Sequence, residues 1–239
     1  MTTATTNELF REDSYLRECS ATITRVDERG VQVDQTVFYP HSGGQPGDTG
    51  VIKREGKPDI RIVDTIKPRD SNEHIHVLED GQPLPEAGEK ISLLIDWERR
   101  HLHMRMHSCM HMLCALIDAP VTGGSIQQDR GRLDFDLTET VDKEKLTVAL
   151  NSLIGADHPM SMRWITDEEL DANPELVRTM SAPPPRGTGK VRLVNFEGID
   201  LQPCGGTHIA STAEIGKVRV SKVEKKGKQN RRIVVVFDD

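Results

Sequence analysis

Several features that would identify other classes of protein are scarce in this sequence of 239 residues. Aromatic residues make up only 4% of it, and it has no apolar run of about eighteen residues, which argues against a membrane-spanning helix. The opening Met1 to Asn7 lacks the basic and apolar regions of a secretory signal, so we expect a cytoplasmic protein with no membrane partner. Its four cysteines show no disulfide framework, and in a reducing compartment they would be thiols or metal ligands.

Positive charge is also in deficit. The formal net charge of −7 speaks against a general nucleic-acid binder, and no DNA partner is expected. Eight basic residues nevertheless stand between Lys217 and Arg232, beside the single acid Glu224. This stretch is either the solvated edge of a terminal hairpin or a strip that contacts RNA phosphates weakly and in a salt-sensitive way. The candidates for tRNA contact are Lys217, Lys222, Lys225, Lys226, Lys228 and Arg231.

Residues 1–95 have the pattern of a small, mostly β unit. Apolar and polar residues alternate from Ser20 to Val37 around the turn Asp27-Glu28-Arg29-Gly30, which predicts a β-hairpin. Further strands are expected at Ile60 to Ile66, His74 to Leu78 and Lys90 to Asp96.

A glycine-rich segment interrupts this β pattern. Four glycines and two prolines fall between Pro40 and Gly50, so the segment cannot be a regular helix or strand. It is either a long surface loop or a backbone that comes close to a ligand, which clustered glycines permit.

The pattern changes to helical at Trp97. Apolar residues recur at spacings of three and four, which predicts an amphipathic helix from Trp97 to Asp118. A second stripe on it consists of His103, His107, His111 and Cys114. Histidines four apart on a helix are neighbours and could bind one metal ion, but His103 with His107 satisfies this spacing as well as His107 with His111 does. A second helix is expected at Val141 to Leu153, with Thr140 as its N-cap.

Two further metal ligands are predicted near the C-terminus. Cys204 and His208 are four residues apart around Gly205-Gly206, where the chain can bend sharply. Imidazole and thiolate are preferred ligands of Zn²⁺, whereas Mg²⁺ and Ca²⁺ prefer oxygen. The sequence therefore predicts one zinc ion per chain, held by Cys204, His208 and one histidine pair of the helix, either His107 with His111 or His103 with His107.

Four motifs in order now carry a resemblance to a known family. They are Phe38 to Gly50, His107-x-x-x-His111, Gly124-Ser125 with Arg132 to Asp136, and Cys204-Gly205-Gly206-Thr207-His208. Together they resemble the editing region of alanyl-tRNA synthetase and, in a chain of this length, the free-standing AlaX editing proteins of the medium form, which keep the glycine-rich N-terminal unit. The resemblance covers nearly everything from about residue 20 onward, and it favours His107 and His111 over His103 as ligands.

The resemblance implies an ATP-independent hydrolase that protects translation fidelity. Its substrate would be the ester of mischarged tRNA(Ala), with Ser as the wrong amino acid and Gly as a second candidate. Zinc would activate water for attack on that ester, so His107, His111, Cys204 and His208 are the expected catalytic ligands, with His208 either a direct ligand or a neighbour of one.

Substrate contacts are also implied. Backbone N–H groups of Gly43, Gly44, Gln45, Gly205 and Gly206 would hold the terminal adenosine or the oxyanion. The hydroxyls of Thr122, Ser125 and Thr207 are candidate partners for a substrate hydroxyl. Met110 and Thr122 stand where the synthetases usually carry Thr and Gln, which bears on the substrate range more than on the reaction.

Two other functions remain open: a zinc-stabilised tRNA- or protein-binding module without catalysis, and a zinc hydrolase of another small ester. The expected fold is α+β, with an N-terminal small β-barrel-like domain at residues 1–95. An α/β two-layer editing domain would follow at 96–239, with an antiparallel sheet packed on the long helix. The sequence does not fix the oligomeric state.

Overall fold

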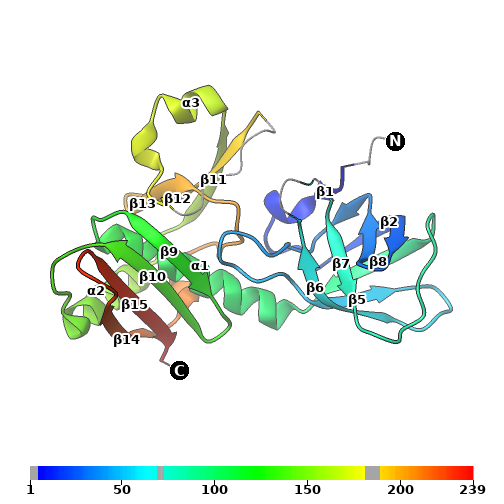
Figure 1. Ribbon diagram of the computed structural model, residues 1–239, viewed down its shortest axis with the longest axis horizontal. Helices are drawn as coiled ribbons and strands as arrows, with labels where there is room; N and C mark the ends of the chain where they lie inside the picture. The colour runs from blue at the N-terminus through cyan, green and yellow to red at the C-terminus, as the bar shows by residue number, and fades with distance from the viewer. Residues whose placement is uncertain (1–4, 69–70, 72, 181–188, 239) are drawn as a thin grey trace. The chain divides into compact units, whose positions relative to one another are not determined.

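The computed structural model describes residues 5–68, 71, 73–180 and 189–238. The chain divides into two compact units, Met1–His101 and Leu102–Asp239. The expected division between residues 95 and 96 lies before the first helix, whereas this division falls inside it, because α1 (Trp97–Leu116) begins in the first unit. In Figure 1 the strands of the first unit run from blue to blue-green and those of the second run from green to red.

The N-terminal unit is a closed barrel of six strands, in the order β2-β3-β7-β6-β5-β8. Every neighbouring pair is antiparallel, and Ile23, Ile52 and Leu93 fill the core at no more than 1% exposure. The predicted β-barrel-like character of this region is confirmed. The strands are β2 Glu18–Asp27, β3 Gly30–Val33, β5 Gly50–Lys53, β6 Ile60–Ile66, β7 Ile75–Leu78 and β8 Lys90–Ile95, with the short pair β1 Asn7–Glu8 and β4 Gln35–Thr36 and the 3-10 turn η1 Leu9–Arg11 beside them.

The glycine-rich segment is mostly a loop that joins β4 to β5. Its first glycines, Gly43 and Gly44, have positive φ angles of 55° and 83°. They form a tight turn in which Ser42 and Gln45 exchange backbone hydrogen bonds of 2.9 and 3.1 Å. Positive φ is the conformation that favours glycine, so the turn by itself accounts for these two residues.

Close contact with the barrel accounts for the later glycines. A Cβ atom on Gly47 would lie 2.2 Å from the carbonyl oxygen of Thr65, and one on Gly50 would lie 2.1 Å from that of Leu94. Neither carbonyl can move without breaking its strand. These two glycines are therefore explained by packing within the unit.

A buried ion pair fixes the loop to the start of α1. Arg100 and Asp48 are both 0% exposed, and the Arg100 guanidinium contacts both carboxylate oxygens of Asp48. The same guanidinium donates to the carbonyl oxygens of Ser14 and Val37. The Asp48 carboxylate also accepts the Tyr39 N–H at 2.6 Å. A buried ion pair is stable only when such hydrogen bonds satisfy both partners.

Replacing Asp48 should therefore destabilise the N-terminal unit strongly. We expect Asp48→Ala to lower its free energy of unfolding by about 3–5 kcal/mol, because Arg100 would remain charged and buried without its partner. The measurement is urea unfolding followed by the fluorescence of Trp97, with Trp164 of the other unit replaced by Phe in all samples. Asp80→Ala, at an exposed position, is the matched control and should change stability by less than about 0.5 kcal/mol. Equal effects of the two substitutions would contradict the structural role of the pair.

Two buried histidines lie on β7 and just before it. The His76 ring is fully buried, with Nε2 2.9 Å from Thr36 Oγ1 and Nδ1 3.2 Å from the Val31 carbonyl oxygen. Burial, aided by the neighbouring His74, lowers the pKa of His76 to about 3. The ring is therefore neutral in the folded protein over the physiological range.

This burial makes the barrel sensitive to acid. Between about pH 6.5 and pH 3 the unfolded chain protonates His76 while the folded chain does not, so stability falls as pH falls, by up to about 1.4 kcal/mol per pH unit. We expect His76→Asn to flatten the pH dependence of unfolding between pH 6.5 and 5. The exposed His41, changed to Asn, is the control and should leave the slope unchanged. The same slope in wild type and His76→Asn would refute this explanation.

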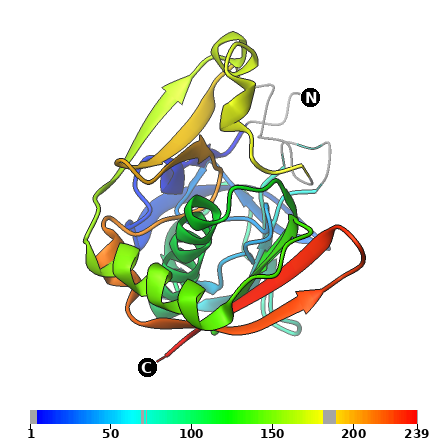
Figure 2. The same ribbon diagram turned by 90° about the vertical axis from the view of Figure 1, so that its left-hand side faces the viewer.

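The C-terminal unit contains two antiparallel sheets. The larger has the strand order β14-β15-β10-β9, and the smaller is β11-β12-β13. Figure 2 shows α1 beside the larger sheet and the antiparallel pair β11 and β12 standing away from it. The elements are β9 Val121–Ile126, β10 Arg130–Asp136, α2 Lys143–Gly155, β11 Met160–Ile165, α3 Asp167–Asp171, η2 Pro174–Leu176, β12 Val191–Phe196, β13 Asp200–Pro203, η3 Thr212–Ile215, β14 Val218–Lys225 and β15 Asn230–Phe237.

The apolar stripe of α1 meets the larger sheet at a glycine. A Cβ atom on Gly131 of β10 would lie 2.8 Å from the sulfur of Met110 and 2.9 Å from that of Met106. The predicted helix is confirmed, although it ends at Leu116 rather than at Asp118. Across the described ranges, none of the helices has the length and apolar character needed to cross a membrane.

The start of α2 differs from the expectation. The helix begins at Lys143, and its N-cap is Asp142, whose side chain accepts the Lys145 N–H at 3.0 Å. Thr140 was expected in this role. Asp and Thr are both favourable N-cap residues, and apolar periodicity does not locate a helix end to within two residues.

Candidate metal centre

Helix α1 supplies two imidazoles to the candidate site. His107 and His111 lie one turn apart, with ring centroids 5.5 Å apart. Within the described part of the chain, the group able to hold a metal ion consists of these two histidines with Cys204 and His208. His103 lies one further turn toward the N-terminus, is fully buried and is not a member of the group.

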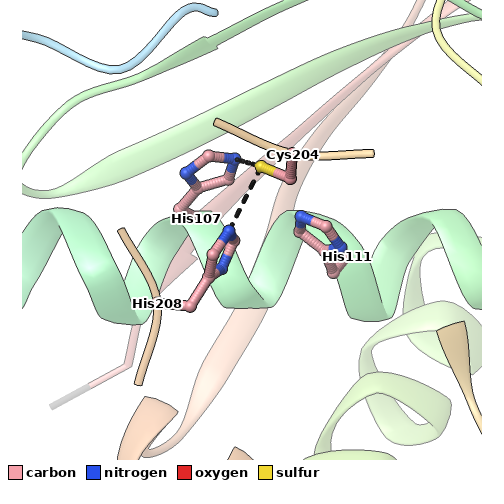
Figure 3. A group of neighbouring side chains, drawn as sticks. All are labelled: His107, His111, Cys204 and His208. Atoms are coloured by element: carbon pink, nitrogen blue, oxygen red, sulfur yellow. Dashed lines mark hydrogen bonds between the residues drawn. The ribbon is translucent and has the colours of Figure 1, made fainter. Parts of the chain in front are cut away.

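The loop after β13 supplies the other two side chains. Cys204 follows directly on that strand, and Figure 3 shows its sulfur between the rings of His107 and His208. The sulfur lies 3.5 Å from His107 Nε2 and 3.2 Å from His208 Nε2. The donor atoms of all four residues lie within 4.8 Å of one another.

These distances fit one tetrahedral zinc ion. With Zn–S near 2.3 Å and Zn–N near 2.05 Å, sulfur and nitrogen ligands of a tetrahedral site are separated by about 3.6 Å. The two separations between sulfur and nitrogen are close to that value. Three imidazoles and one thiolate also form a donor set suited to zinc. The residues therefore fit the ion that the sequence predicts.

A second layer of polar groups fixes the orientation of two rings. The Asp200 carboxylate accepts a hydrogen bond of 2.7 Å from His111 Nδ1–H, while the Gln202 amide donates to the same carboxylate oxygen at 2.8 Å. Ser108 Oγ lies 3.1 Å from His208 Nδ1. With Nδ1 engaged in both rings, Nε2 remains to bind a metal.

Sequence reasoning did not identify these supporting residues. One signal was present, because Asp200 and Gln202 are two apart on a strand, share one face, and lie four and two residues before the cysteine. Ser108 gave no such signal.

The site favours a thiolate. Burial raises the pKa of Cys204, but the neighbouring His107 and His208 rings outweigh burial and hold this pKa well below its usual range. Burial lowers the pKa of His111, but Asp200 and Cys204 outweigh it and raise this pKa to about 10. Burial and the charge of His107 keep the pKa of His208 well below its ordinary value. A thiolate is the form of cysteine that binds metal.

The cluster is exposed on one side. His111 and His208 are 4% and 1% exposed, whereas His107 and Cys204 are only partly buried. A substrate would therefore approach a bound ion past His107 and Cys204.

The structure places the candidate hydroxyls differently. Thr207 is fully buried in the loop between Cys204 and His208. The hydroxyl of Thr122 donates to the Asp134 carbonyl oxygen at 3.1 Å and accepts from the Asn230 amide at 2.8 Å. Of these two candidate partners for a substrate hydroxyl, Thr207 is therefore the one that lies in the loop between Cys204 and His208.

The side chain of Ser125 points away from α1, the helix that carries His107 and His111. Its register partner on β10 is Arg132, whose Nε donates to Ser125 Oγ at 2.9 Å. The adjacent Gly131 faces α1, and successive residues of a strand point to opposite faces. Arg132 and Ser125 therefore lie on the face opposite α1, so the structure does not bring Ser125 to the metal-binding side chains.

The basic strip is only partly a surface feature. Arg231 is 7% exposed, and its guanidinium donates to the carbonyl oxygens of Thr138 and Glu139, because β15 alternation turns it inward. This placement corrects the expectation that it contacts tRNA. The exposed members of the strip are Lys217, Arg219, Lys222, Lys225, Lys226 and Lys228, and all of these except Arg219 were candidates for tRNA contact.

Two domain families match this chain. The Threonyl and Alanyl tRNA synthetase second additional domain matches residues 191–234, which include β12, β13 and the cysteine loop. The tRNA synthetases class II (A) family matches residues 3–99, which include the barrel.

Whole-chain relatives define the family more closely. An alanyl-tRNA editing protein AlaX-M of Methanosarcina acetivorans is 35% identical, and the alignment covers 98% of this chain and 100% of that protein. AlaX-M of Saccharolobus solfataricus is 32% identical, with 95% and 97% covered. An alanine–tRNA ligase of Pyrobaculum neutrophilum is 36% identical over 92% of this chain but 25% of the ligase. The chain belongs to the AlaX family of alanyl-tRNA editing proteins, and its relatives over the full length are of the AlaX-M form.

The second layer yields a prediction about metal affinity. We expect Asp200→Ala to weaken zinc binding about 10- to 100-fold, because the His111 ring would lose the acceptor that orients it. Competition with a chromophoric chelator measures the affinity. Glu197→Gln, an exposed acid three residues earlier on the β12–β13 turn, is the matched control and should bind zinc as the wild type does. Unchanged affinity in Asp200→Ala would show that Asp200 does not support the ligand.

Proposed function

We propose that this protein is a trans-editing hydrolase that deacylates mischarged tRNA(Ala). Ser-tRNA(Ala) is the expected main substrate and Gly-tRNA(Ala) a second one, and the expected setting is cytoplasmic translation. The observation that carries the proposal is the convergence of His107, His111, Cys204 and His208. It occurs in a chain similar, over 98% of its length, to a protein named for alanyl-tRNA editing.

The four clustered residues would hold a zinc ion. When bound, zinc supplies Lewis-acid chemistry, which polarises an ester carbonyl and lowers the pKa of water. The protein's own contribution is to orient His111 through Asp200 and His208 through Ser108, and to exclude water from the buried side of the site.

Backbone amides would stabilise charge on the substrate. N–H groups of Gly205 and Gly206 lie between two ligands, where they would reach the carbonyl oxygen of an ester placed at the ion. Gly43 and Gly44 in the N-terminal unit are kept as candidate backbone donors, whereas the Gln45 N–H already donates to the Ser42 carbonyl oxygen at 2.9 Å. Glycine turns of this kind present backbone N–H groups without side-chain obstruction.

Discrimination between Ser and Ala requires a polar group for the serine hydroxyl. The buried Thr207 is the first candidate, because its hydroxyl lies within the ligand loop. Thr122 is the second, although its hydroxyl already has two partners. A site that pairs a substrate hydroxyl disfavours the analogue lacking it by factors of up to about 10⁴–10⁵.

The tRNA would contact the exposed lysines of the β14–β15 hairpin. Lys222 and Lys226 both bond Glu224, so the lysines of this strip outnumber the acid that neutralises them. Binding through Lys217, Lys222, Lys225, Lys226 and Lys228 would be weak and salt-sensitive on a chain of net charge −7.

A zinc-stabilised binding module is the second candidate function. The observation in its favour is the number of protein ligands, because four tight ligands give the closed arrangement of structural zinc sites. It predicts that metal removal unfolds the C-terminal unit and that no ester is cleaved. A zinc hydrolase of another small ester would instead cleave esters without RNA.

The decisive experiment is deacylation of Ser-, Gly- and Ala-tRNA(Ala) by the purified protein. We expect loss of the Ser ester, and more slowly of the Gly ester, with Ala-tRNA(Ala) spared. Cys204→Ala and chelation should each abolish activity, because the substitution removes one ligand of the metal and the chelator removes the metal itself. Cys19→Ala, a cysteine of the N-terminal unit, is the matched control and should retain activity. Absence of cleavage by the zinc-loaded wild type would reject the proposal.

A further inference from the structure

We propose that Trp164 is the platform on which the adenine of the substrate's terminal adenosine stacks. Trp164 lies on β11, an edge strand of the smaller sheet, and is 46% exposed. The inference rests on the proposed deacylation of tRNA(Ala). It deepens that proposal by assigning a side chain to the base at the end of the tRNA, whereas the metal cluster acts on the ester.

The indole of Trp164 is available to a ligand. Among the described residues, it has no hydrogen-bond partner and no aromatic partner. Trp97, the other tryptophan of the chain, instead packs on the rings of Tyr15 and His101. A single exposed apolar side chain is common on protein surfaces, so the argument depends on where Trp164 lies.

One face of the smaller sheet contacts the metal cluster. Phe196 of β12 packs against His111, with ring centroids 5.7 Å apart, and Asp200 of β13 accepts the hydrogen bond of the same ring. Phe196 and Asp200 are register partners, and side chains directly opposite each other in an antiparallel pair lie on one face. We refer to this side of the sheet as the cluster face.

Trp164 lies on the cluster face. Alternate residues of a strand share a face, so Arg192 is on the same side of β12 as Phe196, four positions later. Trp164 is the register partner of Arg192 on the neighbouring strand β11. Its side chain therefore lies on the side of the sheet that carries the contacts to the metal cluster.

Arg192 connects Trp164 to the candidate ligand Cys204. The Arg192 backbone carbonyl accepts the Cys204 N–H at 3.1 Å, and its Nε donates to the Cys204 carbonyl oxygen at 3.0 Å. Trp164, Arg192 and Cys204 thus form a row across three neighbouring segments. Because adjacent strands are about 4.8 Å apart, the backbone of Trp164 lies about 10 Å from that of Cys204.

An aminoacyl-adenosine has the shape to bridge this separation. One ribose ring separates its ester from its adenine, and the indole of Trp164 extends from the backbone by the length of two fused rings. With the ester at the metal cluster, the adenine would reach the indole along the same face of the sheet. A nucleobase and an indole are both flat, so they stack without directional hydrogen bonds.

The charges near Trp164 favour a base over a phosphate group. Helix α3 begins three residues later and contains four acids in five residues, Asp167, Glu168, Glu169 and Asp171. Two basic residues, Arg163 and Lys190, are also near, but Arg163 points to the opposite face because it is adjacent to Trp164 on the strand. Carboxylates repel phosphates, whereas adenine is uncharged.

The kinetic test compares Trp164→Ala and Trp164→Phe with the wild type. We expect Trp164→Ala to raise KM for Ser-tRNA(Ala) about 5- to 150-fold with kcat nearly unchanged, because stacking on the base is equal in the ground state and the transition state. Trp164→Phe keeps an aromatic face and should retain most of the affinity. Val148→Ala, at a 70% exposed position of α2, is the matched control and should keep the wild-type KM. An unchanged KM in Trp164→Ala would overturn the proposal.

A binding test separates base stacking from a structural role. Two ligands of the zinc-loaded protein are compared: the amide analogue of seryl-adenosine, and the same compound with hydrogen in place of adenine. The wild type should prefer the adenine compound about 5- to 150-fold, and Trp164→Ala should bind the two within about threefold of each other. Equal losses of both ligands in Trp164→Ala would show that Trp164 merely supports the fold, and a wild type without preference for adenine would also overturn the proposal.

Tryptophan fluorescence provides a readout independent of turnover. Trp97→Phe leaves Trp164 as the single tryptophan, and adenine stacked on its indole should quench the emission in a saturable way. The compound without adenine should leave the emission unchanged. Unquenched emission while the adenine compound binds, as measured by calorimetry, would reject the platform. Failure of the proposed function is distinguishable, since there the wild type cleaves no aminoacyl-tRNA whatever the fluorescence shows.

Discussion

The hydroxyl of Ser108 is the contact on which the arrangement of the site depends. It lies 3.1 Å from His208 Nδ1 and accepts the Ile209 N–H at 3.4 Å, so one side chain of α1 holds a loop 100 residues away in sequence. Each pair of ligands comes from a spacing of four within one segment. This tertiary contact, together with the one between His111 and Asp200, holds the helical pair and the loop pair at the same point.

The residues that support the site contact different parts of it. Ser108 and Asp200 act on imidazole rings, whereas Arg192 acts on the backbone that carries Cys204. Rings need a fixed tautomer, and the loop needs fixed peptide planes. The smaller sheet supplies one contact of each kind, since Arg192 lies on β12 and Asp200 lies on β13. The register between these two strands therefore affects the geometry of the candidate ligands.

Local patterns predicted the helix and both ligand pairs because a period of four residues is visible in the chain itself. Spacing could not choose between His103 and His111; the family resemblance did. The inward placement of Arg231 and the outward one of Ser125 depend on which face of the larger sheet meets α1, and that is set by Met106 and Met110 packing over a glycine. The part played by Asp200 depends on the position of β13, which no local pattern records.

The partial exposure of Cys204 bears on how the protein ages in an oxidising cell. A partly exposed thiolate is the kind of sulfur that peroxides convert first to a sulfenic acid and then irreversibly to higher acids. An ion covering the sulfur withholds its electron pairs from such oxidants. Zinc supply would therefore determine how long each molecule survives, and a shortage would leave permanent damage that restored zinc cannot repair.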